Sequence, residues 1–361
     1  MFPPALKITL ANLDEMKALY TSAPGQYGLT NRPKPEPGDG EALIKVIRAG
    51  FCANDLRIRE GVLTQMGFPF IPGHQYAGII EDCGPGVRHT QPGDRVAIHS
   101  YVLCGQCESC RKGGTHDCSR YAALGFTLDG GLAEYNVAPE KCLFPLPNHL
   151  SMDEGVLLES LANALAAIRR VTLQPGNRVL IIGATPIGLA AIQVARLYSP
   201  KSLVLLGTGT HRLKKAQVLG ATDVVDIQGT AVENDVRAAL DGNADAVLLC
   251  GYGRYDFIIA MELVGPMGRI LVEGHYDPLA EIPFKPRDLI PKSITLVPNR
   301  GWSTPDFQLA LELASNGMVD LKSLVTHTYT LDDWQEAFDL FGNVSSDALQ
   351  VSIAPHGVDT R

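Results

Sequence analysis

Four cysteines, Cys104, Cys107, Cys110 and Cys118, lie close together in the segment CGQCESCRKGGTHDC. Their C-x2-C-x2-C-x7-C spacing can bring four thiolates into a tetrahedral shell around one zinc ion. Disulfide bonds and chance clustering are the alternatives, and they fit less well because the rest of the chain suggests a reducing compartment. Four sulfur ligands leave no open coordination position. We therefore expect this zinc to be structural and the chemistry to lie elsewhere.

A second chemical feature is the segment GATPIG, residues 183–188, which follows the apolar run RVLIIG and opens a helical stretch. It resembles the G-x-G-x-x-G turn that brings a pyrophosphate to a helix N-terminus, with Thr185 in place of the middle glycine. An ordinary tight turn is the alternative. The strand before the segment, the helix after it and the alternating series that follows favour dinucleotide binding.

The end of the next strand bears on the choice of dinucleotide. An NAD site needs an acidic residue about 20 positions after the turn for the ribose 2′-hydroxyl, but Gly207 occupies that place and no Asp or Glu occurs between Glu159 and Asp223. Two threonines, Arg212 and Lys215 could accept a 2′-phosphate instead, so we predict NADP(H). The alternative is that both basic residues belong to a solvated helix face. The predicted cofactor-binding residues are Gly183, Thr185, Pro186, Ile187, Gly188, Gly207, Thr208, Thr210 and Arg212.

The composition limits the class of protein. With 361 residues and 45% hydrophobic content, the chain is too long for one ordinary core and suggests two domains. The net charge of −8 argues against a nucleic-acid or anionic-membrane partner. No apolar run approaches the roughly 20 residues of a membrane helix, and the N-terminus does not resemble a secretory signal. We expect a cytoplasmic protein.

The elements that must position these residues change character along the chain. Segments 41–50, 76–84 and 94–100 read as strands within a half that is rich in Gly and Pro. From Ser151, a plausible N-cap with Glu154 three residues later, a long helical pattern begins. About six apolar strands then alternate with helices, which implies a parallel sheet covered on both faces. Helical stretches at 307–317 and 331–343 are expected to return to the first domain.

Three further residues are unremarkable one by one. Cys52 follows a strand in AGFCANDLR, His74 precedes one in PGHQYAG, and Glu159 lies on the long helix in LLESLANAL. Together with the cysteine segment and the phosphate-binding turn, they make the chain resemble the zinc-dependent medium-chain dehydrogenases/reductases, the superfamily of alcohol, sorbitol and threonine dehydrogenases. The resemblance covers nearly the whole chain, and further landmarks are PGDRVA, GGLAEY and VTHTYTLDDWQEAF.

The resemblance implies the fold and the site. The fold would be α/β: a GroES-like, β-rich catalytic domain, residues 1–155 and 299–361, with a Rossmann NADP-binding domain, residues 156–298. A catalytic zinc would be held by Cys52, His74 and Glu159, which makes two Zn²⁺ per chain, and its open position would polarise a substrate oxygen. Arg300 matches an arginine that sorbitol dehydrogenases place beside the metal. It could anchor Glu159 or a substrate oxygen, or lie on the surface.

The chain departs from the family pattern in two places. The family usually has Ser or Thr two residues after the zinc cysteine, as a proton relay, whereas here Asn54 offers an amide that cannot shuttle a proton in that way. The common GHE is GHQ, with Gln75, which removes a charge near the metal and should make it more electrophilic. The alternative is that both substitutions arose by sequence drift without changing the reaction. Asp55 is expected to orient His74 through a hydrogen bond.

Three functions remain open. The first is an NADP(H)-dependent zinc alcohol dehydrogenase or carbonyl reductase acting on a polyol, secondary alcohol or ketone, with Asn54 in contact with the substrate oxygen. The second is conjugate reduction of an enone or imine, which Asn54 favours. The third is a non-catalytic protein that has kept the fold. In each case the partner is a small molecule, and the family implies a homodimer or homotetramer.

Overall fold

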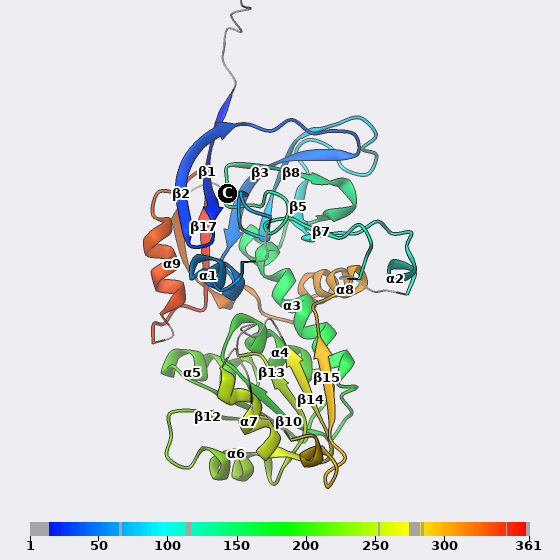
Figure 1. The fold of residues 1–361 in the computed structure, drawn as a ribbon, viewed down its shortest axis with the longest axis vertical. Helices are drawn as coiled ribbons and strands as arrows, with labels where there is room; N and C mark the ends of the chain where they lie inside the picture. The colour runs from blue at the N-terminus through cyan, green and yellow to red at the C-terminus, as the bar shows by residue number, and fades with distance from the viewer. Residues whose placement is uncertain are drawn as a thin grey trace, which may run out of the picture.

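The computed structural model describes residues 14–64, 67–112, 117–251, 253–273, 282, 285–343 and 345–358. Residues 1–13, with which the predicted catalytic domain begins, lie outside these ranges. The described chain forms two lobes connected by a long helix (Figure 1). Within the described ranges, no helix is both long and apolar enough to cross a membrane.

The lower lobe in Figure 1 is built on a six-stranded sheet in the order β12-β11-β10-β13-β14-β15, in which every neighbouring pair is parallel. This order confirms the predicted doubly wound Rossmann arrangement. The strands are β10 (Arg178–Ile182), β11 (Ser202–Gly207), β12 (Asp223–Asp226), β13 (Ala244–Leu249), β14 (Val264–Glu273) and β15 (Thr295–Asn299). The helices between them are α4 (Pro186–Arg196), α5 (Thr210–Leu219), α6 (Val232–Leu240) and α7 (Arg254–Leu263), with a short 3-10 turn, η2 (Pro286–Leu289).

Burial on both faces explains why these strands are apolar throughout. Val179 and Ile181 of β10 belong to one core cluster, and Leu180 and Ile182 belong to another. Side chains alternate between the two faces of a strand, so one run of apolar residues serves both clusters. A strand buried on both faces reads as a continuous apolar run rather than as an alternating one.

The upper lobe is built on a seven-stranded sheet in the order β16-β17-β3-β4-β5-β9, with β8 also paired to β3. Its strands are β3 (Glu41–Gly50), β4 (Gln75–Cys83), β5 (Arg95–Ile98), β8 (Tyr135–Pro139), β9 (Leu143–Pro145), β16 (Val325–Thr330) and β17 (Gln350–Ala354). Around it lie the hairpin β1 (Glu15–Ala23) and β2 (Gln26–Pro33), the short pair β6 (Tyr101–Val102) and β7 (Ala122–Ala123), the helices α1 (Ala53–Arg59), α2 (Glu108–Arg111) and α9 (Trp334–Gly342), and the 3-10 turns η1 (Glu140–Cys142) and η3 (Lys322–Leu324).

The C-terminal segment completes the upper lobe, as predicted. Strand β17 pairs antiparallel with β3, with Ser352 opposite Gly50. On α9, the ring of Phe338 lies 4.0 Å from that of Phe51, between centroids. The last helix and strand are thus tied to the segment that carries Cys52.

The long helix α3 (Met152–Arg170) connects the two lobes. It begins as predicted, because the Glu154 amide donates to Ser151 Oγ at 3.2 Å and Glu154 Oε2 accepts the Ser151 amide at 2.8 Å. Near its start, a Cβ on Gly155 would stand 3.0 Å from the side chains of Ala77 and Leu146, so glycine lets the helix approach the upper sheet. Further along, α3 contacts α4 and α8 (Thr304–Ser315).

The predicted domain limits fall inside elements. The limit between 155 and 156 lies within α3, and the limit between 298 and 299 lies within β15. They stay predictions.

Candidate metal sites and cofactor cleft

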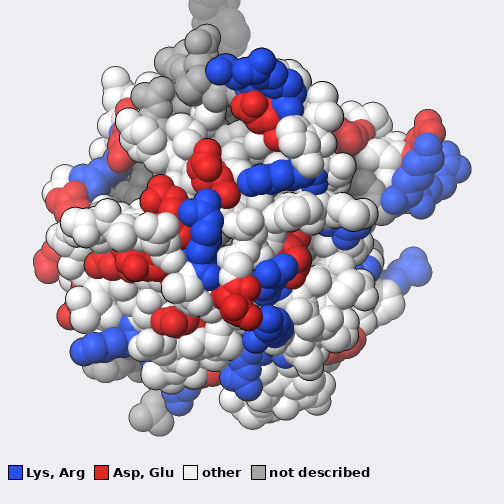
Figure 2. All heavy atoms as spheres, turned by 90° about the horizontal axis from the view of Figure 1, so that it is seen from below, with Lys and Arg blue, Asp and Glu red and all other residues white. Residues whose placement is uncertain are grey.

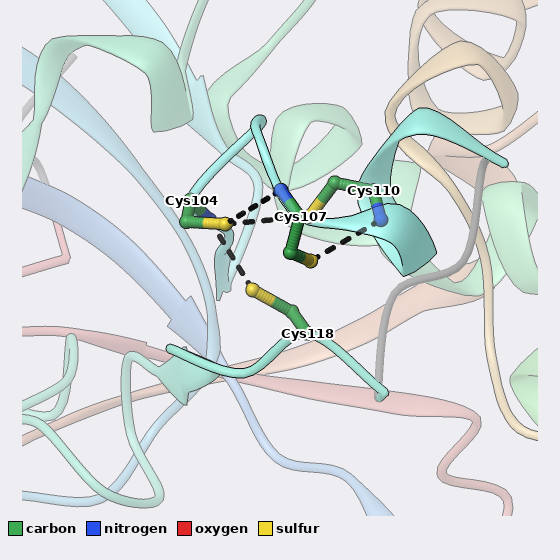
Figure 3. Close-up of side chains that lie close together, drawn as sticks. All are labelled: Cys104, Cys107, Cys110 and Cys118. Atoms are coloured by element: carbon green, nitrogen blue, oxygen red, sulfur yellow. Dashed lines mark hydrogen bonds between the residues drawn. The ribbon is translucent and has the colours of Figure 1, made fainter.

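The four cysteines converge on one point, at one end of the short helix α2 (Figure 3). Their sulfur atoms all lie within 4.8 Å of one another, and Cys104 Sγ is 3.9 Å from Cys110 Sγ. A tetrahedron with Zn–S bonds of about 2.3 Å has edges of about 3.8 Å. None of the eight cysteines forms a disulfide. The donor set and its spacing fit a zinc ion, whereas a disulfide would need an S–S distance of about 2 Å.

Backbone amides stabilise thiolates in this cluster. The Cys107 amide donates to Cys104 Sγ at 3.4 Å, and the Cys110 amide donates to Cys107 Sγ at 3.5 Å. The bond from the Cys110 amide is the main reason why the pKa of Cys107 is lowered to about 6. Desolvation raises the pKa of Cys110 to about 12. The sulfurs are therefore unequal without a cation, and a cation at their centre would favour the thiolate form of all four.

A second cluster lies where β3 ends and β4 begins. Cys52 caps helix α1, where its Sγ accepts the Asn54 amide at 3.3 Å and its own amide donates to Asp55 Oδ2 at 2.8 Å. His74 immediately precedes β4 and is buried. One ligand atom each from Cys52, Asp55 and His74 lie within 4.8 Å of one another.

Glu159 reaches the same cluster from the middle of α3. Its Oε1 lies 3.2 Å from His74 Nε2, while the other ring nitrogen, Nδ1, lies 4.0 Å from Asp55 Oδ1. Asp55 and Glu159 thus face opposite edges of the imidazole. A metal ion bound at Nε2 would stand on the Glu159 side. Asp55 faces Nδ1, but within the described chain neither Asp55 Oδ1 nor His74 Nδ1 has a hydrogen-bond partner, so the predicted hydrogen bond between them is not formed. The ring also stacks on Phe126, with centroids 4.4 Å apart.

Several ionisable side chains are buried together in this cluster. Burial opposes a charge on His74, yet Glu159 and Cys52 raise its pKa well above the ordinary value. Burial also raises the pKa of Asp55. Buried anions of this kind need a counter-charge. Because thiolate, imidazole and carboxylate are all ligands that Zn²⁺ accepts, the residues present fit a zinc ion.

A cavity of about 140 Å³ runs from this cluster to the phosphate-binding turn. It is lined from the upper lobe and α3 by Phe51, Cys52, Ala53, Leu56, Gln75, Ser160, Phe341, Gly342 and Gln350, and from the lower lobe by Thr185, Pro186, Ile187 and Arg212. The cavity therefore joins Cys52, one of the three predicted metal ligands, to the predicted dinucleotide turn, while His74 and Glu159 are not among its lining residues.

Two of the predicted catalytic residues, Asn54 and Arg300, do not line this cavity. Asn54 is half-buried and is not among the residues that line the cavity. Arg300 is exposed, and its Nη1 pairs with Asp117 Oδ1 at 3.2 Å, which fits the surface alternative rather than an anchor for Glu159. The physical reason lies one residue earlier. The side chain of Asn299 is buried and its Nδ2 donates to Asn163 Oδ1 on α3 at 3.0 Å, so the next side chain points to solvent.

The structure of the phosphate-binding turn shows why Thr185 can replace the middle glycine of the G-x-G-x-x-G pattern. Gly183 has φ +116°, and a Cβ at Gly188 would stand 2.0 Å from the Gly183 oxygen, so both glycines are required. Thr185 has φ −88° and caps α4, because its Oγ1 accepts the Gly188 amide at 3.2 Å and donates to the Cys250 oxygen at 2.9 Å. The amide of Ile187, in the first turn of α4, has no carbonyl one turn earlier within the helix. It is available to an anion.

The end of β11 is closely packed against this turn. Gly207 is buried, and a Cβ on it would stand 2.9 Å from Ala184 Cβ. Arg212 is buried on α5, which argues against the alternative of a solvated face for this residue, whereas Lys215 is half-buried. Arg212 Nη1 donates to the Ala184 oxygen at 3.2 Å, and its Nε has no hydrogen-bond partner within the described chain. Burial lowers the pKa of this guanidinium. Thr208 and Thr210 lie between the two residues, and Thr210 begins α5.

Three polar residues of the site were missed by the sequence analysis. Ser100 Oγ donates to Glu159 Oε2 at 3.5 Å, Ser160 Oγ accepts the Gln75 amide at 3.5 Å, and Gln350 Nε2 donates to the Phe51 oxygen at 3.0 Å. Ser160 could have been found as the neighbour of Glu159. Nothing in the sequence distinguishes the other two.

Two family models match the chain, "Alcohol dehydrogenase GroES-like domain" over residues 38–148 and "Zinc-binding dehydrogenase" over residues 186–316. Among the curated relatives, a sorbitol dehydrogenase from Halalkalibacterium halodurans is 32% identical, over 94% of this chain and 99% of the relative. An L-threonine 3-dehydrogenase from Pyrococcus horikoshii is also 32% identical, over 91% and 95% of the two chains.

Solved structures agree over the whole fold. A structure described as a zinc-binding dehydrogenase from Sinorhizobium meliloti, bound to NADP, has a TM-score of 0.87 at 25% identity, covering 95% of this chain and 100% of that one. The RspB alcohol dehydrogenase of Escherichia coli, in complex with NADH, has a TM-score of 0.86 at 26% identity, covering 94% and 99%. Domain matches, full-length relatives and fold agree, and the chain belongs to the zinc-dependent medium-chain dehydrogenase/reductase family.

Proposed function

We propose that this chain is a zinc-dependent, NADP(H)-preferring dehydrogenase or carbonyl reductase. It would interconvert a polyol or secondary alcohol and the corresponding ketone. The observation that carries the proposal is the cavity that joins Cys52, beside His74 and Glu159, to the capped turn at Thr185. Two relatives that match nearly the full length are named as dehydrogenases of sorbitol and of L-threonine, both of which carry secondary hydroxyl groups.

In this proposal Cys52, His74 and Glu159 hold a catalytic zinc, and the four cysteines at 104, 107, 110 and 118 hold a structural one. When bound, zinc supplies a Lewis acid for the substrate oxygen, and NADP(H) supplies or accepts the hydride. Asp55 would face the opposite edge of the His74 ring, with its carboxylate 4.0 Å from Nδ1. The apolar residues that line the cavity would exclude water from the reacting atoms.

The preference for NADP(H) is supported by the residues at the end of β11. A buried Gly207 offers no carboxylate for a ribose 2′-hydroxyl, and Arg212 is a buried guanidinium whose Nε is unpaired within the described chain. Such a group is a strong partner for a phosphate. One structural neighbour binds NADP and another binds NADH, so the fold alone does not decide the cofactor.

Proton transfer must work without a hydroxyl at position 54. The Asn54 side chain cannot relay a proton as a serine does. In our proposal, water within the cleft takes that role.

A second candidate is conjugate reduction of an enone or imine, which Asn54 favours because such a reaction needs no alcohol proton relay. Product analysis with deuterated NADPH separates the two. Label on a carbinol carbon supports the carbonyl reductase, and label on a β-carbon or an imine carbon supports the alternative. A panel of carbonyl compounds with no turnover, on protein holding one zinc, would favour the third, non-catalytic function.

The partner would be a small molecule, and we propose a homodimer or homotetramer, to be tested by light scattering on the purified chain. On the face drawn in Figure 2, acidic and basic side chains are interspersed, with no extended basic area of the kind that binds nucleic acid.

The deciding experiment measures metal content per chain together with binding of NADPH and NADH on the same sample. Two zinc ions and tighter binding of NADPH are expected. One zinc ion would contradict the catalytic metal site, and equal binding of the two dinucleotides would contradict the cofactor preference.

A further inference from the structure

Gln75 connects the two segments that would hold the catalytic metal. It follows His74 directly, begins β4, and is buried, with 4% of its surface exposed. Its Nε2 lies 3.4 Å from Glu159 Oε1 and 3.5 Å from Ser160 Oγ, both on α3. The side chain therefore spans from the strand to the helix at the point where His74 and Glu159 meet.

The orientation of this amide is set by chemistry. An ionised carboxylate only accepts hydrogen bonds, so the nitrogen of the amide must face Glu159 and the oxygen must point away. Within the described chain, Gln75 Oε1 has no hydrogen-bond partner of its own. The hydrogen bonds of this side chain thus go to Glu159 and its neighbour.

Glu159 is held on both of its oxygens. His74 Nε2 and Gln75 Nε2 converge on Oε1, at 3.2 and 3.4 Å, while Ser100 Oγ donates to Oε2 at 3.5 Å. If a metal replaced the His74 contact, the donors from Gln75 and Ser100 would still fix the carboxylate plane. An ionised glutamate at position 75, which is common in the family, could not donate this hydrogen bond, whereas the Gln75 amide does.

We infer that Gln75 is a positioning residue, which holds the Glu159 carboxylate in the orientation that binds the catalytic metal through the hydrogen bond from its amide. The inference rests on the proposed function, since it takes Glu159 as a ligand. Partners of metal-binding side chains that lie one step from the metal typically contribute 10- to 100-fold to metal affinity.

The test uses the full-length chain and Gln75→Met, which keeps the length and neutrality of the side chain but removes the donor. Zn²⁺ affinity is measured by chelator competition, and the visible spectrum is recorded after Co²⁺ substitution. The difference between the parent and Cys52→Ser spectra defines the bands of this site. We expect Gln75→Met to weaken binding of that metal equivalent at least about tenfold and to shift its cobalt bands.

The matched control is Gln193→Met. Gln193, on α4 of the lower lobe, is a comparably buried glutamine whose side-chain amide bonds the backbone of Asp320. Its loss should leave affinity and cobalt bands as in the parent. Gln75→Met with affinity within twofold of the parent and unchanged bands would overturn the inference. If Gln75→Met does not fold, Gln75→Asn is used instead, because it keeps the amide on a shorter side chain. We expect it to lower metal affinity as well.

A double-mutant cycle shows whether Gln75 acts through Glu159. In the Glu159→Gln background, Gln75→Met should change metal affinity by less than twofold. Independent, additive losses would mean that Gln75 acts by another route, which contradicts the inference while leaving the proposed function intact. A parent protein that holds one metal ion would overturn the proposed function, and the inference with it.

Discussion

Replacing Gly207 by aspartate tests the cofactor proposal at the residue that carries it. The new carboxylate would follow β11, where an NAD site has an acidic residue for the ribose 2′-hydroxyl. It has little room, because a Cβ at this position stands 2.9 Å from Ala184 Cβ and 3.1 Å from the Ala184 nitrogen. The phosphate-binding turn must therefore shift by a few tenths of an ångström.

The size of the effect follows from two terms that act on different cofactors. Like unit charges 4 Å apart repel by about 1 kcal/mol in water and about 4 kcal/mol near a protein surface. Repulsion between the new carboxylate and the 2′-phosphate should weaken NADPH binding by an amount in this range. A hydrogen bond from a hydroxyl to a charged carboxylate contributes about 1.5–3 kcal/mol, which favours NADH. With about 1.4 kcal/mol per factor of ten, the NADPH/NADH preference should fall at least about fifty-fold.

Steric strain at Ala184 should weaken binding of both dinucleotides alike. The ratio of their affinities therefore reports only the effect of the carboxylate charge. Gly207→Ala is the control, because it introduces the same Cβ contact without the carboxylate. Fluorescence titration of NADPH and NADH on the parent and both variants gives the ratio directly. An equal ratio in all three proteins, or the same change in Gly207→Ala as in Gly207→Asp, would refute the reasoning.

Three other perturbations have defined outcomes. Cys52→Ser should remove one zinc equivalent and the activity while leaving the fold, and full retention of both metals by metal analysis would contradict the ligand assignment. Thr185→Ala removes the cap of α4 and the bond to the Cys250 oxygen; a loss of about 1–2 kcal/mol in unfolding free energy is expected in denaturant titration, and Thr185→Ser should recover most of it. Burial lowers the pKa of His99 to about 4 from 6.5. As the pH falls, His99 is therefore protonated in the unfolded chain before it is protonated in the folded one. The contribution of neutral His99 to the free energy of unfolding is therefore fully present above pH 6.5, and it falls by up to about 3 kcal/mol as the pH drops towards 4. His99→Phe, among the surrounding aromatic rings, should flatten that part of the pH dependence, and an unchanged slope would show that other groups cause it.

Local signals in the sequence predicted most of the fold. The capping box at Ser151 marks the start of α3 within one residue, and apolar runs mark all six strands of the parallel sheet. These signals are strong because each depends on near neighbours in the chain. Helices α6 and α7, which cover the parallel sheet, were not named, although VENDVRAAL has apolar residues at helical spacing.

The site was less accessible to sequence reasoning, because its contacts join distant segments. Gln75 and Glu159 are 84 positions apart, and no periodicity connects them. Arg300 shows why the sequence could not decide between a role at the metal and one on the surface. A family resemblance places it near the metal, but the direction of a side chain at the end of β15 depends on Asn299 turning inward to Asn163. Thr185 looked like a defect in a glycine pattern and is a helix cap, which becomes clear only from its φ of −88°.

The position of Glu159 links the fold to the proposed chemistry. A carboxylate in the middle of a buried helix is costly unless its charge is compensated, and only 7% of this side chain is exposed. The donors that reach it are the adjacent residues His74 and Gln75 and, from a second stretch of the upper lobe, Ser100. Hydrogen bonds alone would be served as well by a neutral glutamine, without the cost of burying a charge. In our proposal a cation between Cys52, His74 and Glu159 provides that compensation, so Glu159→Gln should reduce the stabilisation that Zn²⁺ gives to the protein. Thermal unfolding of both proteins with and without Zn²⁺ measures this, and an equal increase in stability on adding Zn²⁺ to the two proteins would contradict the argument.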